Sequence, residues 1–537
     1  MDFVSFEFYV FLAVVVIAYY IVPLRFRWYV LLAASLYYYA VVTTYSHELF
    51  VFLGIIAISW LFGLLHEKLK MMDQNAAGAS QAKTSAQETA TSDTQSSETG
   101  TASGTPSDES GSGASGKAGW TQHLPLIRKL VLAASVLLML GLLFLAKYPA
   151  YLYTAEYLLH LNHLGILITV GVSFFIMQII AYLVDVYRGK VHAQRNPLKY
   201  ALFVSFFPQI IQGPIPRYEQ LGPQLTQGHK FDEDGFVKGF MLIIWGFFLK
   251  LMIADKAGIV VDALFESYKA YQGSYALVAG ILYSIQLYAD FLACVTLAQG
   301  MSELLGIHLA DNFRRPYFAT SIKEFWNRWH LSLSTWLRDY VYIPLGGNRK
   351  GKLRKYINLC LTFLVSGMWH GNGVKYIFWG LMHAGYQILG ALTERIRDKL
   401  YCLVGLTKGR KVRVWISRAF TFFFVMLAWI VFRAETLEQG LFMVKSIFTV
   451  YNPWIFFNDS LLEFGLDWKE SMILIFSVMT LIWVSVKQEA GFQLRDAVLR
   501  QPLFVRWAIY LTAIAVIIVF GSYGYGFDAA DFIYGNF

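Results

Sequence analysis

The sequence is poor in charged residues. Asp, Glu, Lys and Arg make up 15% of its 537 residues, whereas an ordinary soluble domain contains roughly 25%. Hydrophobic residues make up 56% and aromatic residues 17%, and apolar runs near the ~20 residues that cross a bilayer recur along the chain. This composition excludes a soluble globular protein and predicts a polytopic helical membrane protein.

Cysteine is scarce, and the motifs of several enzyme classes are absent. Cys294, Cys360 and Cys402 are far apart and form no Cys-x-x-Cys pair. Neither a disulfide framework nor a zinc site is therefore indicated, and we expect no metal. The sequence also has no Gly-x-Ser-x-Gly elbow, Walker loop, His-Glu-x-x-His motif or EF-hand loop. A lipase-like serine and a nucleotide-binding loop are thus not indicated either.

Apolar segments from end to end of the chain are candidate membrane spans. They cover approximately residues 4–22, 28–43, 49–66, 128–147, 165–187, 236–253, 274–306, 356–370, 375–393, 414–432, 471–486 and 504–521. Two shorter apolar pieces, 150–161 and 198–212, are predicted to be re-entrant or interfacial. The first span follows an acidic start without a cleavage site, so we expect it to be retained. The expected fold is all-α, with roughly 11–14 transmembrane helices and re-entrant or interfacial amphipathic helices around a central cavity.

Basic residues mark the loops that would face the cytoplasm. The stretch 395–418 is rich in Lys and Arg. Another basic cluster contains no acid and consists of Arg349, Lys350, Lys352, Arg354 and Lys355. The positive-inside rule then places the N-terminus outside, and spans 356–370 and 375–393 form a hairpin that leaves from and returns to the cytoplasm. These loops account for the net charge of +9 without any nucleic-acid partner.

The composition divides the chain into three parts. Residues 1–72 are predicted to form N-terminal transmembrane helices, and residues 120–537 the membrane core. Residues 73–119 consist largely of Ser, Thr, Ala, Gly and Gln, with no aromatic residue. Such a segment cannot bury enough apolar surface to offset its chain entropy, so it is predicted to be a disordered cytoplasmic linker. A tolerated insertion is the favoured interpretation, and a regulatory or docking tail is the alternative.

The segment from Ile322 to Val341 is predicted to be an amphipathic helix at an interface or beside a polar cavity. Its apolar positions recur at the helical period and are Ile322, Phe325, Trp326, Trp329, Leu333, Trp336, Leu337 and Tyr340. His330 falls at the edge of this face. A packing histidine with a satisfied hydrogen bond and a functional histidine are equally compatible with that position.

His370 carries the stronger signal. The apolar segment from Tyr356 to Trp369 has about 14 residues, too few to cross a bilayer as a straight helix. The turn Gly371-Asn372-Gly373 is therefore expected at membrane depth, lining a cavity, where His370 could act as a general base. A histidine that caps a helix end is the alternative. His383 could face the same cavity, although a core role is favoured for it.

A histidine pair in a membrane cavity, without a serine nucleophile or metal, suits direct group transfer. One histidine would deprotonate an acceptor hydroxyl, which attacks an activated acyl carbonyl in the same tunnel. A proton-coupled transporter could use histidines in a similar way. The residues alone leave both possibilities open.

Two runs within the signature region 322–386 resemble membrane-bound O-acyltransferases. These runs are FWNRWHLSLSTWLRDYVYIPLGGNR (residues 325–349) and SGMWHG (residues 366–371). The most similar branch is the bacterial one that contains alginate O-acetyltransferase and the D-alanyl transferase of teichoic acid synthesis. Further matching runs are VSFFPQIIQGPIPR (204–217), DNFRRPY (311–317), WIVFRAETLEQ (429–439) and FIYGNF (532–537).

The IPLGGNR run is similar to alginate-type sequences and favours acetyl transfer. The chain departs from the pattern at ADFLACVTLAQG (289–300), where these families commonly show FDFxGY, although Asp290 is retained.

The resemblance implies roles for individual residues. His370 of the WHG motif is the expected catalytic residue, and His330 of the RWH motif is its partner. Residues expected to support the site or line its tunnel are Trp326, Arg328, Trp329, Asp339, Trp369, Gly371, Asn372 and His383.

The resemblance also implies an acyltransferase of the bacterial plasma membrane. It would move an acyl group, acetyl above all, from a cytoplasmic donor toward hydroxyls of an extracellular polysaccharide or cell-wall glycan. No bound cofactor is expected, because acetyl-CoA or an acyl-carrier-protein thioester would be a substrate. A separate extracytoplasmic partner of the serine-hydrolase type is expected to complete the transfer. The alternatives are D-alanyl transfer to teichoic acid and transport of the acyl group or glycan without catalysis.

Overall fold

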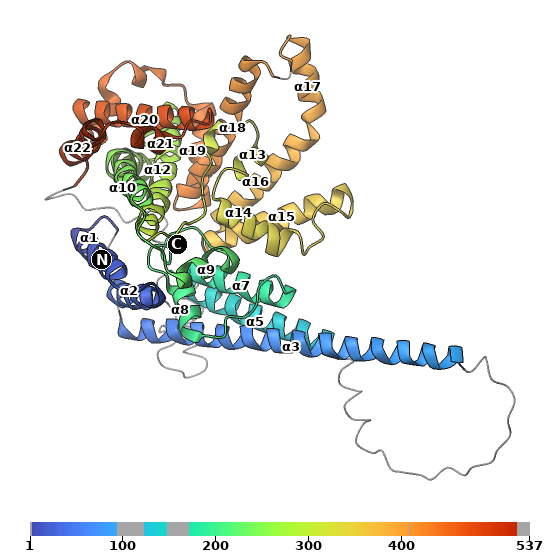
Figure 1. The fold of residues 1–537 in the computed structure, drawn as a ribbon. Helices are drawn as coiled ribbons and strands as arrows, with labels where there is room; N and C mark the ends of the chain where they lie inside the picture. The colour runs from blue at the N-terminus through green and yellow to red at the C-terminus, as the bar shows by residue number, and fades with distance from the viewer. Residues whose placement is uncertain (1–2, 44, 94–122, 148–170, 408, 524–537) are drawn as a thin grey trace, which may run out of the picture.

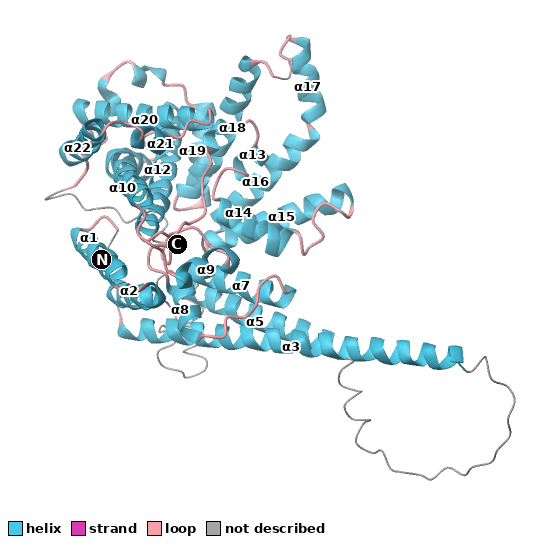
Figure 2. Cartoon of the chain, viewed as in Figure 1, coloured by secondary structure: helices cyan, strands magenta, loops and turns pink. Residues whose placement is uncertain are grey.

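The computed structural model describes residues 3–43, 45–93, 123–147, 171–407 and 409–523 (Figure 1). Within these ranges the chain forms helices joined by loops, and Figure 2 shows no β-strand there. The prediction of an all-α membrane protein is confirmed. The predicted segment 150–161 and the first residues of the predicted span 165–187 lie outside the described residues.

Seven helical segments in the described ranges are long and apolar enough to cross a bilayer. They lie in α3 (Ser46–Asp93), α5 (Leu124–Lys147), the continuous stretch α10 (Glu233–Phe247), η3 (Phe248–Ala254) and α11 (Asp255–Glu266), α12 (Ser274–Leu304), α18 (Lys411–Arg433), α20 (Trp468–Glu489) and α22 (Leu503–Phe520). The other predicted spans correspond to shorter or less apolar helices. These are α1 (Phe6–Ile21), α2 (Arg27–Val42), α7 (Val172–Arg188), α15 (Gly351–His370) and α16 (Val374–Leu392).

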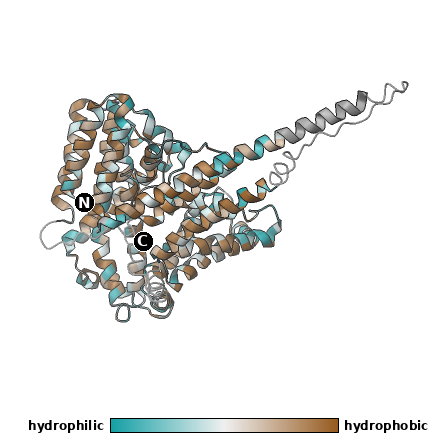
Figure 3. Ribbon diagram, turned by 90° about the horizontal axis from the view of Figure 1, so that it is seen from below, coloured by the Kyte–Doolittle hydropathy of each residue, from teal (hydrophilic) through white to brown (hydrophobic). Residues whose placement is uncertain are grey.

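Helix α3 continues well beyond its apolar part. Its far half projects away from the other helices (Figure 1), and the part of the helix that Figure 3 colours by hydropathy changes from mainly apolar to more polar along its length. The predicted linker was expected to be disordered from residue 73, but the helix extends to Asp93. Ala, Gln, Lys and Glu have high helix propensity, so this stretch can prolong an existing helix without any packing. Residues 94–122 lie outside the described residues.

Helix α12 lies at the centre of the fold, against α10, α11, η3, α18 and α19 (Leu437–Thr449). Gly239 of α10 and Gly300 of α12 face each other at the crossing. A Cβ atom added to Gly239 would lie 2.8 Å from the Gly300 carbonyl oxygen, and one added to Gly300 would lie 2.7 Å from the Gly239 carbonyl oxygen. Small residues thus let the two backbones approach closely, as is common between membrane helices.

The hairpin of α15 and α16 is packed in the same way. A Cβ atom at Gly367 would collide with the Tyr376 carbonyl, and one at Gly380 would collide with the Phe363 carbonyl. Helix α15 begins at Gly351 and has 20 residues, which gives a length of about 30 Å. The helix is thus longer than the apolar segment from Tyr356 to Trp369, because the basic turn before Tyr356 is also helical, and α15 is not among the seven segments of the described ranges that are long and apolar enough to cross a bilayer.

The predicted re-entrant piece 198–212 is buried within the protein. Helix α8 (Pro197–Ser205) is capped by Asn196, whose side chain accepts hydrogen bonds from the backbone N–H groups of Leu198 and Lys199. The chain continues through a turn, and Phe206 and Phe207 are fully buried. The Phe207 N–H donates to Ser35 Oγ of α2 at 3.1 Å. Backbone that leaves the helical pattern is thus enclosed by protein, as a bilayer requires.

Candidate active site

His330 lies in a turn that interrupts the predicted amphipathic helix. Helix α13 (Ile322–Trp326) ends before it and α14 (Leu331–Leu337) begins after it, so the single helix predicted for 322–341 was wrong. The backbone of His330 is left-handed, with φ 44° and ψ 58°, a conformation that costs a non-glycine residue roughly 1–2 kcal/mol. The loop before it supplies compensating hydrogen bonds. Arg314 N–H donates to the Arg328 carbonyl at 2.8 Å, and Leu331 N–H donates to the Asn312 carbonyl at 2.9 Å.

The side chain of Asn312 fixes the His330 ring. Its Oδ1 accepts from the Ser332 N–H at 3.0 Å and from Ser332 Oγ at 2.9 Å, and it lies 3.2 Å from His330 Nδ1. A backbone N–H can only donate, so the atom facing it is an oxygen, and His330 Nδ1 must carry the proton. The other ring nitrogen, Nε2, is then the acceptor nitrogen. Sequence reasoning missed Asn312 because 18 residues and a left-handed turn separate it from His330.

His370 is the last residue of α15 and is 2% exposed. Three aromatic rings meet it edge-on, with centroids 4.8 Å away for Trp369, 5.0 Å for Trp379 and 5.2 Å for Phe432. Gly371 follows it because a Cβ atom there would collide with the Tyr376 ring. His370 therefore lies buried among aromatic rings at the end of a helix.

The indole of Trp369 connects the two histidines. Its centroid lies 4.8 Å from the His370 ring and 6.1 Å from the His330 ring. The Trp369 Nε1–H donates to the carbonyl of Ser173, at the start of α7, at 3.3 Å. Lys147, the last residue of α5, places its Nζ 5.6 Å from the same ring. The structure thus brings His330, Trp369 and His370 together, and it adds Lys147.

Lys147 was missed by the sequence analysis, although a signal was present. It is a basic residue at the end of span 128–147, and the predicted orientation places that end on the extracytoplasmic side, where the positive-inside rule does not favour basic residues. The end of α5, the start of α7 and the end of α15 meet around Trp369. All three are extracytoplasmic ends in the predicted orientation, so the packing of the helices is consistent with that orientation.

His383 occupies a different environment. It is fully buried on α16, and its Nδ1 accepts a hydrogen bond from Trp326 Nε1 at 3.2 Å. Trp379 lies between the two histidines of the hairpin, with its ring centroid 5.0 Å from both His370 and His383. Trp326 thus satisfies one of the two ring nitrogens of His383, and the other, Nε2, is buried without a hydrogen-bond partner among the described residues. Trp326 holds the His383 ring through this hydrogen bond, and the two rings meet edge-on with centroids 5.0 Å apart.

Arg328 belongs to a clamp between the His330 turn and α20. Its Nη1 and Nη2 donate to the two carboxylate oxygens of Glu489, each at 2.9 Å, and its Nε donates to Glu324 at 3.0 Å. Burial raises the pKa of Glu324, but hydrogen bonds from Thr320 and the charge of Arg328 outweigh it and leave that pKa below its ordinary value. Arg328 therefore supports the turn.

The remaining predicted residues lie outside the histidine cluster. Asp339 is part of the π-helical segment η5 (Arg338–Tyr342) and pairs with Arg217 at 3.3 Å and Arg338 at 2.8 Å. Trp329 is buried among aromatic rings and stacks on Phe325 at 5.5 Å. Asn372 is exposed, next to the buried His370.

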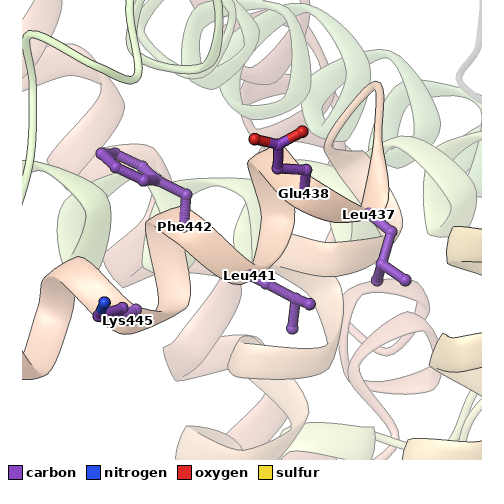
Figure 4. A pocket seen from close by; sticks show the side chains of 5 residues that line it. All are labelled: Leu437, Glu438, Leu441, Phe442 and Lys445. Carbon is purple, nitrogen blue, oxygen red and sulfur yellow. The ribbon is translucent and has the colours of Figure 1, made fainter.

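A surface pocket on α19 is unrelated to this cluster. Its lining side chains all come from one face of that helix (Figure 4). They are Leu437, Glu438, Leu441, Phe442 and Lys445. The pocket contains no histidine, so it is not the candidate active site.

The fold and site define an all-helical membrane protein with two buried histidines that share one tryptophan. Residues 191–434 match the model of the MBOAT, membrane-bound O-acyltransferase family. This matched part of the chain contains His330, Trp369, His370 and His383.

Curated proteins similar to this chain include acyl-transferring enzymes. A probable alginate O-acetylase AlgI of Pseudomonas fluorescens is 39% identical over 285 residues, which cover 53% of this chain and 55% of the relative. A peptidoglycan O-acetyltransferase of Helicobacter pylori is 35% identical over 315 residues, covering 54% and 58%. A teichoic acid D-alanyltransferase of Bacillus subtilis is 30% identical over 225 residues, covering 40% and 56%. The match spans a little over half the length of each relative.

Proposed function

We propose that the protein is a membrane O-acyltransferase of the bacterial plasma membrane. It takes an acyl group, acetyl in our proposal, from a cytoplasmic thioester and passes it to a hydroxyl on the extracytoplasmic side. The observation that carries this proposal is the placement of His330 and His370, both buried, against one indole. Such burial strengthens electrostatic interactions with a reacting group and excludes hydrolysis of the activated acyl group.

The two histidines divide the proton chemistry. We assign His370 as the base that takes the proton of the acceptor hydroxyl as its oxygen attacks the thioester carbonyl. The C–O bond forms, the C–S bond breaks, and the proton leaves His370 for the departing thiolate. We assign His330 the role of orienting the hydroxyl, because its Nε2 accepts a hydrogen bond while Asn312 holds Nδ1–H.

A glycan or cell-wall acceptor is supported by the names of two relatives, an alginate O-acetylase and a peptidoglycan O-acetyltransferase. The donor in our proposal is acetyl-CoA or an acyl-carrier-protein thioester. A separate extracytoplasmic partner of the serine-hydrolase type would complete the transfer. D-alanyl transfer is the second candidate, favoured by similarity to a teichoic acid D-alanyltransferase.

The test compares ester-linked acyl groups on the cell-surface glycan, normalised to membrane abundance by immunoblot. The strains carry wild-type protein, His370→Ala, His192→Ala or no copy. His192→Ala is the control because it also replaces a histidine. The side chain of His192 is 90% exposed and pairs with Glu67, outside the buried histidine cluster. Mild base releases the acid, and mass spectrometry distinguishes acetate from D-alanine.

We expect His370→Ala to match the strain without a copy and His192→Ala to match wild type. Wild-type ester levels with His370→Ala would overturn the assignment of that histidine. Equal levels with and without the gene would overturn acyl transfer altogether. Transport without catalysis predicts appreciable flux with His370→Ala.

A further inference from the structure

Three charged residues are buried together beside α12, away from the histidines. Lys250 Nζ lies 2.9 Å from Asp255 Oδ1 and 3.0 Å from Asp290 Oδ1, and all three side chains are at most 3% exposed. Ionisable groups inside a membrane protein are costly and usually functional. This Lys250 triad has no part in the proposed proton chemistry.

A π-helical segment brings Lys250 and Asp255 to the same side. In an α-helix, residues five apart point about 140° away from each other. Segment η3 instead has the i→i+5 bonding of a π-helix, and Asp255 N–H donates to the Lys250 carbonyl. The carbonyl of Leu251 within η3 accepts from Ser522 N–H at 3.1 Å. Both the side chains and the backbone of this irregular turn are therefore held by specific partners.

The third member of the triad lies next to a residue that contacts His330. Asp290 is on α12, and the ring of Phe291 meets the His330 imidazole edge-on with centroids 4.7 Å apart. Phe291 also lies 5.0 Å from Phe313, the residue after Asn312. One turn of α12 thus contacts both the catalytic-site imidazole and the loop that fixes its tautomer.

Apolar packing alone sets the register of α12 poorly. Lipid and leucine are equally apolar, so sliding or rotating a membrane helix costs little unless polar groups or close contacts specify its position. A buried ion pair is costly to break, because a single partner would be left charged in the interior. The Lys250 triad provides such a specific contact between η3 and α12.

We propose that the Lys250 triad is a positioning device for His330. It fixes the register of α12 so that Phe291 holds the imidazole against Trp369. This inference rests on the proposed acyl transfer, in which His330 orients the acceptor hydroxyl.

The test measures ester per membrane copy for full-length variants in cells. Lys250→Met/Asp255→Asn/Asp290→Asn removes all three charges and leaves none unpaired, so we expect normal abundance and thermal stability. Displacement of His330 should still lower transfer about tenfold or more, as expected for a misplaced catalytic group. Lys256→Met is the matched control. Lys256 is buried like Lys250, but it is on α11 and pairs with Glu470 of α20, outside the triad. We expect it to transfer at the wild-type rate per copy.

A double-mutant cycle separates positioning from a merely structural role. If the triad acts through Phe291, adding Phe291→Leu to the neutral triple variant should cause no further loss. Independent, multiplying losses would overturn the inference, as would wild-type transfer by the triple variant. If the triple variant fails to insert, Asp290→Glu is used instead, because it keeps the negative charge but shifts its position. Wild-type transfer by Asp290→Glu would also overturn the inference. Failure of acyl transfer itself is recognised separately, by absence of ester in the wild-type strain.

Discussion

The imidazole Nδ1 of His330 lies 3.2 Å from the side-chain oxygen of Asn312. The same oxygen accepts the backbone N–H of Ser332 at 3.0 Å, which makes it an acceptor beyond doubt. The proton of His330 is therefore on Nδ1, and Nε2 is an acceptor. A left-handed residue, a short loop pairing and one amide side chain together fix the protonation pattern of a buried histidine.

Replacing Asn312 should impair transfer more than it impairs folding. Asn312→Leu keeps the approximate volume but removes the acceptor for His330 Nδ1, so the ring loses its fixed tautomer. We expect transfer per membrane copy to fall about 10–100-fold, by analogy with the cost of losing the partner that orients a metal-ligating histidine. Ser332→Ala removes one donor to the same oxygen and should have a much smaller effect. Equal transfer by Asn312→Leu and wild type in the glycan-ester assay would contradict the tautomer argument.

His383 should behave unlike His370. His383→Phe retains an aromatic ring in the core but leaves the buried Trp326 Nε1–H without its acceptor. We expect a loss of about 1–3 kcal/mol of stability and transfer per folded copy near wild type. Thermal unfolding in detergent and the ester assay measure the two quantities separately. Loss of transfer by an inserted and stable His383→Phe protein would place His383 in the chemistry.

Much of the fold follows from apolar periodicity, whereas the site depends on exceptions to it. The positions of helices such as α5, α12, α18 and α22 were predictable because long apolar runs have few other solutions in a bilayer. The break at His330 was not predictable, because the backbone N–H groups of Leu331 and Ser332 after it donate to Asn312, which lies in a loop distant in sequence. The π-helical segment that aligns Lys250 with Asp255 was likewise not predictable, because no hydrophobic periodicity in the sequence indicates it.

Arg328 should stabilise the fold through the geometry of its guanidinium and not through its positive charge alone. Arg328→Lys keeps the charge but loses the paired bonds to Glu489, which need the planar guanidinium. Because the pair is partly exposed, we expect a cost of about 1 kcal/mol, seen as a lower thermal midpoint in detergent. Glu489→Gln should lower it similarly, and the two changes together should cost less than their sum. Additive losses would show that the clamp does not act as a unit.

Deleting residues 75–118 should leave transfer largely intact. The far half of α3 projects away from the other helices (Figure 1), and the deletion preserves the ion pair between Asp73 and Arg128 that joins α3 to α5. The readout is again glycan ester per membrane copy. Loss of transfer at normal abundance would show that this segment has a regulatory or docking role.

The most direct test follows an acyl group across the membrane. Inside-out membrane vesicles expose the cytoplasmic face, so labelled acetyl-CoA or an acetylated carrier protein can be supplied to the outside. We expect base-labile label to accumulate in the lumen with wild-type protein, and none above the no-copy background with His370→Ala. Luminal label that is equal in the two, or absent from wild type with both donors, would contradict transfer by the buried histidine pair.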